Sequence, residues 1–315
     1  MIELLVCTLI WGASFVAQKL GADHFGPVSV SCYRNLLAGV ALGLGVCLRD
    51  RYRVRRGFAA DSRGWSLATF AGGGLSGVCL FAAMLTQQLG IERTSTGVSA
   101  FLTANYVLLV PVFGLLVGRK AGRGVWAGVA LALVGTFFIC FADVRSLASG
   151  IKLGVGEAWT LLCATLFAVQ ILVVDHFARD CDMLRFSAVQ VTAAGLVALP
   201  FVFLPSELAR SSWEEFVKGI PALAWLGLVS SGIAYTLQNL GQAKVPAALA
   251  SIIMSLEGAF AAVFGWLLLG DTLAGRQLAG CGLVFLAVLA SQLIPPQKRR
   301  RNAAPRLALR IRKML

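Results

Sequence analysis

Ten runs of predominantly apolar residues, separated by short charged or polar breaks, constrain the fold of this chain more than any other feature. A helix needs about 20 such residues to cross the roughly 30 Å hydrocarbon core of a bilayer. Helices satisfy every backbone donor and acceptor within one segment, and the runs lack the alternation of barrel strands. We therefore expect ten transmembrane helices, near residues 2–21, 27–48, 65–89, 97–118, 124–142, 155–178, 186–204, 219–242, 246–270 and 277–294.

The composition excludes two soluble domains, which a length of 315 residues would otherwise suggest. Hydrophobic residues make up 58% of the chain and charged residues 14%, against about 25% charged in soluble proteins. Most of the eight cysteines lie inside apolar runs without CxxC or Cys/His spacing, and the two histidines are too few for a histidine-based metal centre. We expect an all-α polytopic membrane protein without a cofactor or a metal.

The net charge of +13 is explained mainly by topology. With the N-terminus in the cytoplasm, 20 of the 28 Lys and Arg residues fall in inner segments, seven in outer segments, and Arg34 within a span. Because cytoplasmic loops carry the excess of basic residues, both termini should be cytoplasmic in a plasma (bacterial inner) membrane. The basic tail 295–315 either lies on anionic lipid or is a solvated segment, and a nucleic-acid partner is not expected.

The chain contains an internal duplication. Segment 87–90 matches 238–241, and segment 112–116 matches 263–267, both at an offset of 151 residues. Five spans in each copy force the second copy to enter the membrane inverted relative to the first. We expect two inverted five-helix repeats, 1–143 and 153–294, and inverted repeats are common in secondary transporters.

Several segments resemble the EamA-type family of the drug/metabolite transporter superfamily. Residues 11–16 read WGASFV, Arg34 follows in the second span, and residues 255–271 resemble the ninth helix of the family with the acidic residue after it. Gly258 replaces a proline that is common in the family, which removes one reason for a kink there. The resemblance implies a carrier of small metabolites, often an exporter, with helices of both repeats around a central cavity.

Arg34 and Glu257 are the two ionisable residues deep inside spans, where charge is costly and marks function. Glu257 falls near mid-membrane and Arg34 nearer the outer end of its span, so a close ion pair is not expected. For Arg34 the alternatives are a side chain that snorkels to the interface or a substrate ligand. For Glu257 they are a hydrogen-bonded carboxyl joining two helices, or a group that binds a proton or a substrate amine.

Neutral polar residues complete the candidate substrate site. Each of them has a structural alternative, a hydrogen bond between helices worth about 0.6 kcal/mol. The candidates are Trp11, Ser14, Asn105, Tyr106, Gln170, Gln190, Gln238 and Asn239.

The sequence predicts a secondary transporter, preferentially an exporter, of small polar, amino-acid-like metabolites that works by alternating access. Walker A, HExxH and GxSxG motifs are absent from the sequence, so an enzyme is not expected. The alternative function is a non-transporting membrane scaffold or sensor that uses the basic tail. Substrate, direction, oligomeric state and coupling ion, including proton coupling through Glu257, stay open.

Overall fold

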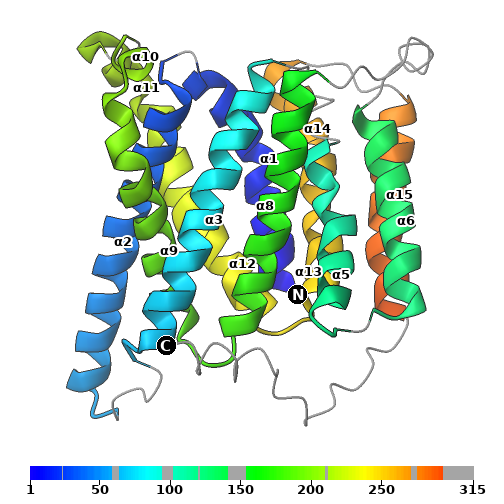
Figure 1. Cartoon of the computed structure of the whole chain (residues 1–315), viewed down its shortest axis with the longest axis horizontal. Helices are drawn as coiled ribbons and strands as arrows, with labels where there is room; N and C mark the ends of the chain where they lie inside the picture. Colours follow the sequence, from blue (N-terminus) through cyan, green and yellow to red (C-terminus); the bar gives the residue numbers. More distant parts are fainter. Residues whose placement is uncertain are drawn as a thin grey trace.

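The computed structural model of the protein describes residues 1–22, 24–58, 64–93, 102–119, 121–140, 154–209, 212–270 and 275–293. All regular elements in these ranges are helices, and the long ones lie side by side (Figure 1). The predicted tail 295–315 and the acidic residue Asp271 lie outside the described residues.

The first half of the chain contributes five described helices: α1 (Ile2–Ala22), α2 (Pro27–Arg55), α3 (Leu67–Ile91), α5 (Tyr106–Leu116) and α6 (Arg123–Cys140). The second half contributes α8 (Val155–Phe177), α9 (Met183–Ala198), the 3₁₀-helix η1 (Leu199–Phe203), α10 (Pro205–Leu208), α11 (Trp213–Ala224), the π-helix η2 (Trp225–Ala234), α12 (Tyr235–Gln242), α13 (Ala247–Met254), α14 (Leu256–Leu269) and α15 (Gly275–Leu293).

Every apolar run in the sequence coincides with helix in the described ranges. Among the described residues, six stretches are long and apolar enough to cross a bilayer, and four further apolar helices are shorter. The six are Pro27–Arg55, Leu67–Gly90, Val155–Phe177, Met183–Phe203, Trp213–Gln242 and Ala247–Leu268. The main boundary error is α2, which continues to Arg55, past the expected end at residue 48.

Local sequence signals explain where several helices begin and end. Pro27 occupies the first turn of α2, where its missing N–H costs nothing. The side chain of Ser66 accepts a hydrogen bond from the backbone of Thr69 at the start of α3, and Asp182 caps α9 in the same way. Gly270, with a φ of 72°, ends α14 in the left-handed conformation.

Two apolar runs are interrupted inside the protein. The helical hydrogen-bonding pattern breaks at Asn105, before α5, and at Ser255, between α13 and α14. The second break occurs although position 258 is a glycine rather than the proline that is common in EamA-type proteins. Pro111 lies inside the continuous helix α5. A third irregularity is η2, since ten-residue π-helices are rare and π-segments are often found at functional sites.

The strongest helix packing joins the two halves of the chain. α6 packs on α15, α3 on α8 and α9, α2 on α9, and α1 on α14. Small residues permit this close approach: a Cβ atom on Gly280 of α15 would lie 2.6 Å from the carbonyl oxygen of Gly135 on α6. The halves are therefore interleaved rather than two separate bundles.

Buried apolar side chains form two main clusters. One, the α2–α3–α9 core, includes Cys32, Leu80 and Ala194. The other, the α5–α6–α13–α15 core, includes Val110, Ala132, Ile252 and Val284. Trp11 of α1 and Phe167 of α8 pack against both cores, so α1 and α8 lie between them.

We call the two ends of the helix bundle the Met1 end and the Glu207 end. The Met1 end carries the start of α1, the end of α2 and the start of α9 (lower end in Figure 1). The Glu207 end carries the connection from α1 to α2, where Glu207 of α10 accepts hydrogen bonds from the backbone N–H groups of Val28 (3.2 Å) and Ser29 (2.9 Å).

Candidate functional site

A cavity lies among helices of both halves. Its empty volume, including its open mouth, is about 770 Å³. The first half contributes Trp11, Phe15, Gln18, Pro27, Val30, Ser31, Arg34, Met84, Gln87, Gln88 and Tyr106 to its lining. The second half contributes Phe167, Gln170, Ile171, Ser230, Tyr235, Gln238, Met254 and Glu257.

The cavity is directed toward the Glu207 end. Gln18 lies near the last turn of α1, Pro27 is the first residue of α2, and Gln87 and Gln88 lie in the last turn of α3. Toward the Met1 end, Gln238 donates a hydrogen bond to Gln170 (3.3 Å). Gln170 in turn donates to Ser76 (3.4 Å) on α3. These buried amides join α12, α8 and α3 across the floor of the cavity.

Tyr106 and Glu257 meet at the two helix breaks. The Tyr106 hydroxyl donates a hydrogen bond to Oε1 of Glu257 over 3.2 Å, from the first turn of α5 to the first turn of α14. Tyr106 is buried and Glu257 half-buried, with its accessible surface in the cavity. The two residues are 151 positions apart, which is the offset found between the repeated segments.

Arg34 is held by the π-helix η2. Its Nε donates to the Ser231 hydroxyl and its Nη2 to the Ser230 hydroxyl, both over 2.8 Å. The residue is only 7% exposed and lines the cavity, so the snorkelling alternative is wrong for this side chain. No ion pair joins Arg34 to Glu257, as their expected depths indicated.

Aromatic rings line the same cavity as the two charged residues. The ring centroids of Trp11 and Tyr235 are 4.9 Å apart, and the indole N–H of Trp11 donates to the backbone carbonyl of Ser230 over 3.4 Å. Phe167 packs edge-on against Tyr106, with ring centroids 6.5 Å apart. The cavity therefore offers one cation, one acid, aromatic faces and several amides.

Six of the ten predicted site residues line the cavity, namely Trp11, Arg34, Tyr106, Gln170, Gln238 and Glu257. The other four, Ser14, Asn105, Gln190 and Asn239, are not among the lining residues.

Each of those four side chains makes a structural hydrogen bond instead. Ser14 accepts from the indole of Trp225 (3.0 Å). Asn239 donates to Gln190 (2.6 Å) and to Ser187 (2.8 Å) between α12 and α9. Asn105 donates to the carbonyl of Leu102 at the helix break (3.2 Å).

Several lining residues were missed by the sequence prediction. Gln87 and Gln88 belong to the segment 87–90 that matches 238–241 in sequence, and the correspondence of Gln87 to the predicted site residue Gln238 was a usable signal. Ser230 carried no signal, because Ser is common in membrane helices and π-helical geometry is not visible in sequence. Tyr235 was also missed; it follows directly after the π-helix η2, whose geometry is not visible in sequence.

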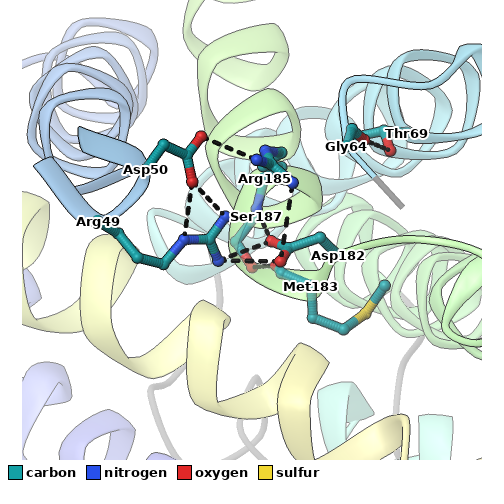
Figure 2. Close-up of polar contacts among 8 residues, drawn as sticks. All are labelled: Arg49, Asp50, Gly64, Thr69, Asp182, Met183, Arg185 and Ser187. Carbon is teal, nitrogen blue, oxygen red and sulfur yellow. Dashed lines mark hydrogen bonds and ion pairs between the residues drawn. The ribbon is translucent and has the colours of Figure 1, made fainter. Parts of the chain in front are cut away.

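An ion cluster outside the cavity joins α2 to α9 at the Met1 end; we call Arg49, Asp50, Asp182 and Arg185 the α2–α9 ion cluster (Figure 2). Nη1 of Arg49 lies 2.9 Å from Oδ2 of Asp182. Nη2 of Arg185 lies 2.8 Å from Oδ2 of Asp50. Each arginine thus pairs with an aspartate of the other helix, which fixes the register of α2 on α9.

Two more ion pairs at the Met1 end also link the halves, Arg119 with Asp175 and Lys244 with Glu3. Within the described ranges, no three His, Cys, Asp or Glu side chains are grouped so that they could hold a metal ion. The cavity lining itself offers charges, hydrogen-bonding groups and aromatic faces for binding.

Charged, amide and aromatic side chains of both halves thus face one cavity among apolar helices. The chain belongs to the EamA-like transporter family, whose model matches residues 1–141 and 154–292. Family and helices together define a multi-pass membrane transporter.

The chain is similar to several named transporters over most of its length. An uncharacterized transporter of Archaeoglobus fulgidus is 28% identical, with 92% of this chain and 84% of the relative covered. The S-adenosylmethionine/S-adenosylhomocysteine transporter of Chlamydia trachomatis is 25% identical, with 88% and 86% covered. A "probable terminal-alkyne amino-acid exporter" of Streptantibioticus cattleyicolor is 24% identical, with 96% of each chain covered.

A solved crystal structure has a similar fold. It matches with a TM-score of 0.70 at 17% sequence identity, and the match covers 93% of this chain and 96% of the other. At this identity the likeness concerns the fold alone.

Proposed function

We propose that this protein is a secondary transporter that exports small polar, amino-acid-like metabolites across the plasma membrane by alternating access. The observation that carries the proposal is the cavity, because it combines Arg34 from the first half with Glu257 from the second half at membrane depth. Charges there are costly and are retained where they serve transport.

The proposed architecture is ten transmembrane helices in two inverted repeats, 1–143 and 153–294, followed by a cytoplasmic tail. Contact between Tyr106 and Glu257 supports it, since residues at equivalent positions of two inverted copies meet at the axis that relates them. Discontinuous helices at both positions support it as well, because broken helices commonly form transporter sites.

The proposed orientation places the Met1 end in the cytoplasm, as the distribution of basic residues indicates. The cavity is then open toward the outside, and the buried Gln170–Gln238 contact closes it from the cytoplasm. Below that contact, an apolar cluster that includes Val174, Met183 and Phe186 fills the Met1 end. The structure would thus represent an outward-facing state.

The named functions of two relatives support a small-metabolite substrate. S-adenosylmethionine and amino acids both carry an ammonium and a carboxylate group, and the relatives named for them match this chain over most of its length. A cavity with one cationic and one acidic residue suits such molecules.

Reconstituted flux tests the proposal. Proteoliposomes preloaded with unlabelled amino acids should accumulate radiolabelled amino acid by exchange, whereas liposomes that contain the Glu257→Gln variant should accumulate it at least tenfold more slowly. The matched control is Glu92→Gln, an exposed carboxylate at the end of α3 that is outside the cavity lining. A scaffold or sensor that uses the tail predicts no flux and a function lost on truncation after residue 294.

A further inference from the structure

Arg34 is a fixed cation without a counter-ion in the described structure. Two serine hydroxyls orient its guanidinium, each over 2.8 Å, and both serines lie on the π-helix η2. No carboxylate of the described residues lies within 4.0 Å of it. Hydroxyl groups accept its hydrogen bonds but do not neutralise its charge.

Arg185, the second buried arginine among the described residues, shows how this protein accommodates a structural charge. Arg185 is 6% exposed, nearly the same as Arg34 at 7%. Its guanidinium pairs with Asp50 and approaches Asp182. A buried charge is strongly unfavourable unless it is paired. Arg34 is therefore the exception in a protein that pairs a comparably buried arginine with carboxylates.

The geometry of Arg34 leaves donors free toward the cavity. Nε and Nη2 are engaged by Ser231 and Ser230, whereas Nη1 has no hydrogen-bond partner among the described residues. Nη1 is also not one of the fully buried unsatisfied atoms, and Arg34 lines the cavity. A guanidinium held in this way presents its remaining N–H groups to a planar anion.

We propose that Arg34 binds the carboxylate group of the transported molecule, and that Ser230 and Ser231 are positioning residues which aim the guanidinium. This inference rests on the proposed transport function and assigns the substrate class and its orientation. Trp11 and Tyr235 provide the adjacent aromatic surface, and Glu257 on the second half receives the cationic end. The negative charge of Glu257 in the same cavity disfavours a doubly charged phosphate. We therefore assign a carboxylate as the anion that binds Arg34.

Matched probes test this assignment on the full-length purified protein. The probes are leucine, methionine and phenylalanine, each compared with its carboxamide at mildly acidic pH, where both forms keep the ammonium group. Apparent affinity is measured from the concentration dependence of the thermal unfolding midpoint. We expect at least one amino acid to bind about tenfold or more tightly than its amide, since hydrogen bonds between charged groups are the strong ones.

Variants show which residues cause the preference for the acid over the amide. Arg34→Gln should bind the acid and the amide equally, Arg34→Lys should retain part of the preference, and the exposed Arg51→Gln should retain all of it. Ser230→Ala with Ser231→Ala should reduce the preference without abolishing binding. If Arg34→Gln does not fold, the comparison of acid and amide on the unmodified protein still tests whether the site prefers a carboxylate.

The outcomes separate this inference from the proposed function. If the unmodified protein binds an amide as tightly as its acid, or if Arg34→Gln keeps the preference, the assignment is wrong. Proteoliposomes that transport amide and acid at equal rates would uphold transport and reject the carboxylate subsite. Proteoliposomes that transport neither, with no probe bound, would reject both.

Discussion

The α2–α9 ion cluster should contribute measurably to stability because it joins the two halves by partly buried charges. Removing the Asp50 carboxylate by Asp50→Asn leaves Arg185, whose side chain is 8% exposed, with Asp182 at 4.0 Å as its nearest carboxylate in the cluster. Breaking a fully buried pair costs about 3–5 kcal/mol, whereas an exposed pair is worth about 0–1 kcal/mol. Asp50 is 31% exposed, which places the pair between these limits.

We expect Asp50→Asn to lower the free energy of unfolding by about 1–2 kcal/mol, the range between exposed and buried pairs. Arg185→Gln should cost more, because Arg185 also stacks over Trp65 at 5.8 Å. The double variant should cost less than the sum of the two by about 1–2 kcal/mol, since both single changes break the same contact.

The assay is equilibrium unfolding of the purified protein in mixed detergent micelles with increasing denaturing detergent. Arg51→Gln, an exposed arginine next to Asp50 in sequence, is the control and should leave stability unchanged. Single changes that simply add in the double variant would refute the reasoning, because they would show that Asp50 and Arg185 do not stabilise the protein through each other.

Three further predictions follow from the contacts. Glu257→Gln should flatten the dependence of flux on pH between about pH 5 and 8, because it removes the carboxyl group of the cavity lining, whereas Tyr106→Phe should keep that dependence. Gly280→Val should lower the thermal midpoint, since its first added atom would lie 2.6 Å from the Gly135 carbonyl oxygen and overpacking costs about 1–3 kcal/mol. Asn239→Ala should destabilise the protein yet leave substrate preference intact, because Asn239 bonds α9 and does not line the cavity; an altered preference would contradict this.

The helices were predictable from sequence because apolar runs report membrane-length helices directly. Interruptions at Asn105 and Ser255 were not, since both residues lie within continuous apolar runs and neither is a proline or glycine. The π-helix was equally hidden, because its wider turns arise from packing rather than from composition.

The site was predictable only in part because polarity does not report which way a side chain points. Gln238 lines the cavity, whereas its neighbour Asn239 is rotated by about 100° around the helix and bonds α9. Glu257 and Arg34 were found because a charge at membrane depth is costly and is retained mainly where it serves a function. A neutral amide in a membrane helix can either bind substrate or form a hydrogen bond to another helix, and sequence alone does not separate these two roles.

The packing also changes which parts should move in an alternating-access cycle. Motion of one repeat as a unit would break the tight α6–α15, α2–α9 and α3–α8 contacts, all of which join the halves. Relative motion of the α2–α3–α9 core and the α5–α6–α13–α15 core would preserve α6 on α15 and α2 on α9.

The two charged residues lie on helices that contribute to different cores, α2 and α14. Arg34 lies on α2, whereas Glu257 is bonded to Tyr106 of the α5–α6–α13–α15 core. Relative motion of the cores would therefore change the distance between the charges. A substrate that carries both an ammonium and a carboxylate would bind most tightly in the state where that distance matches its own length, and such differential binding is what couples a substrate to a conformational change.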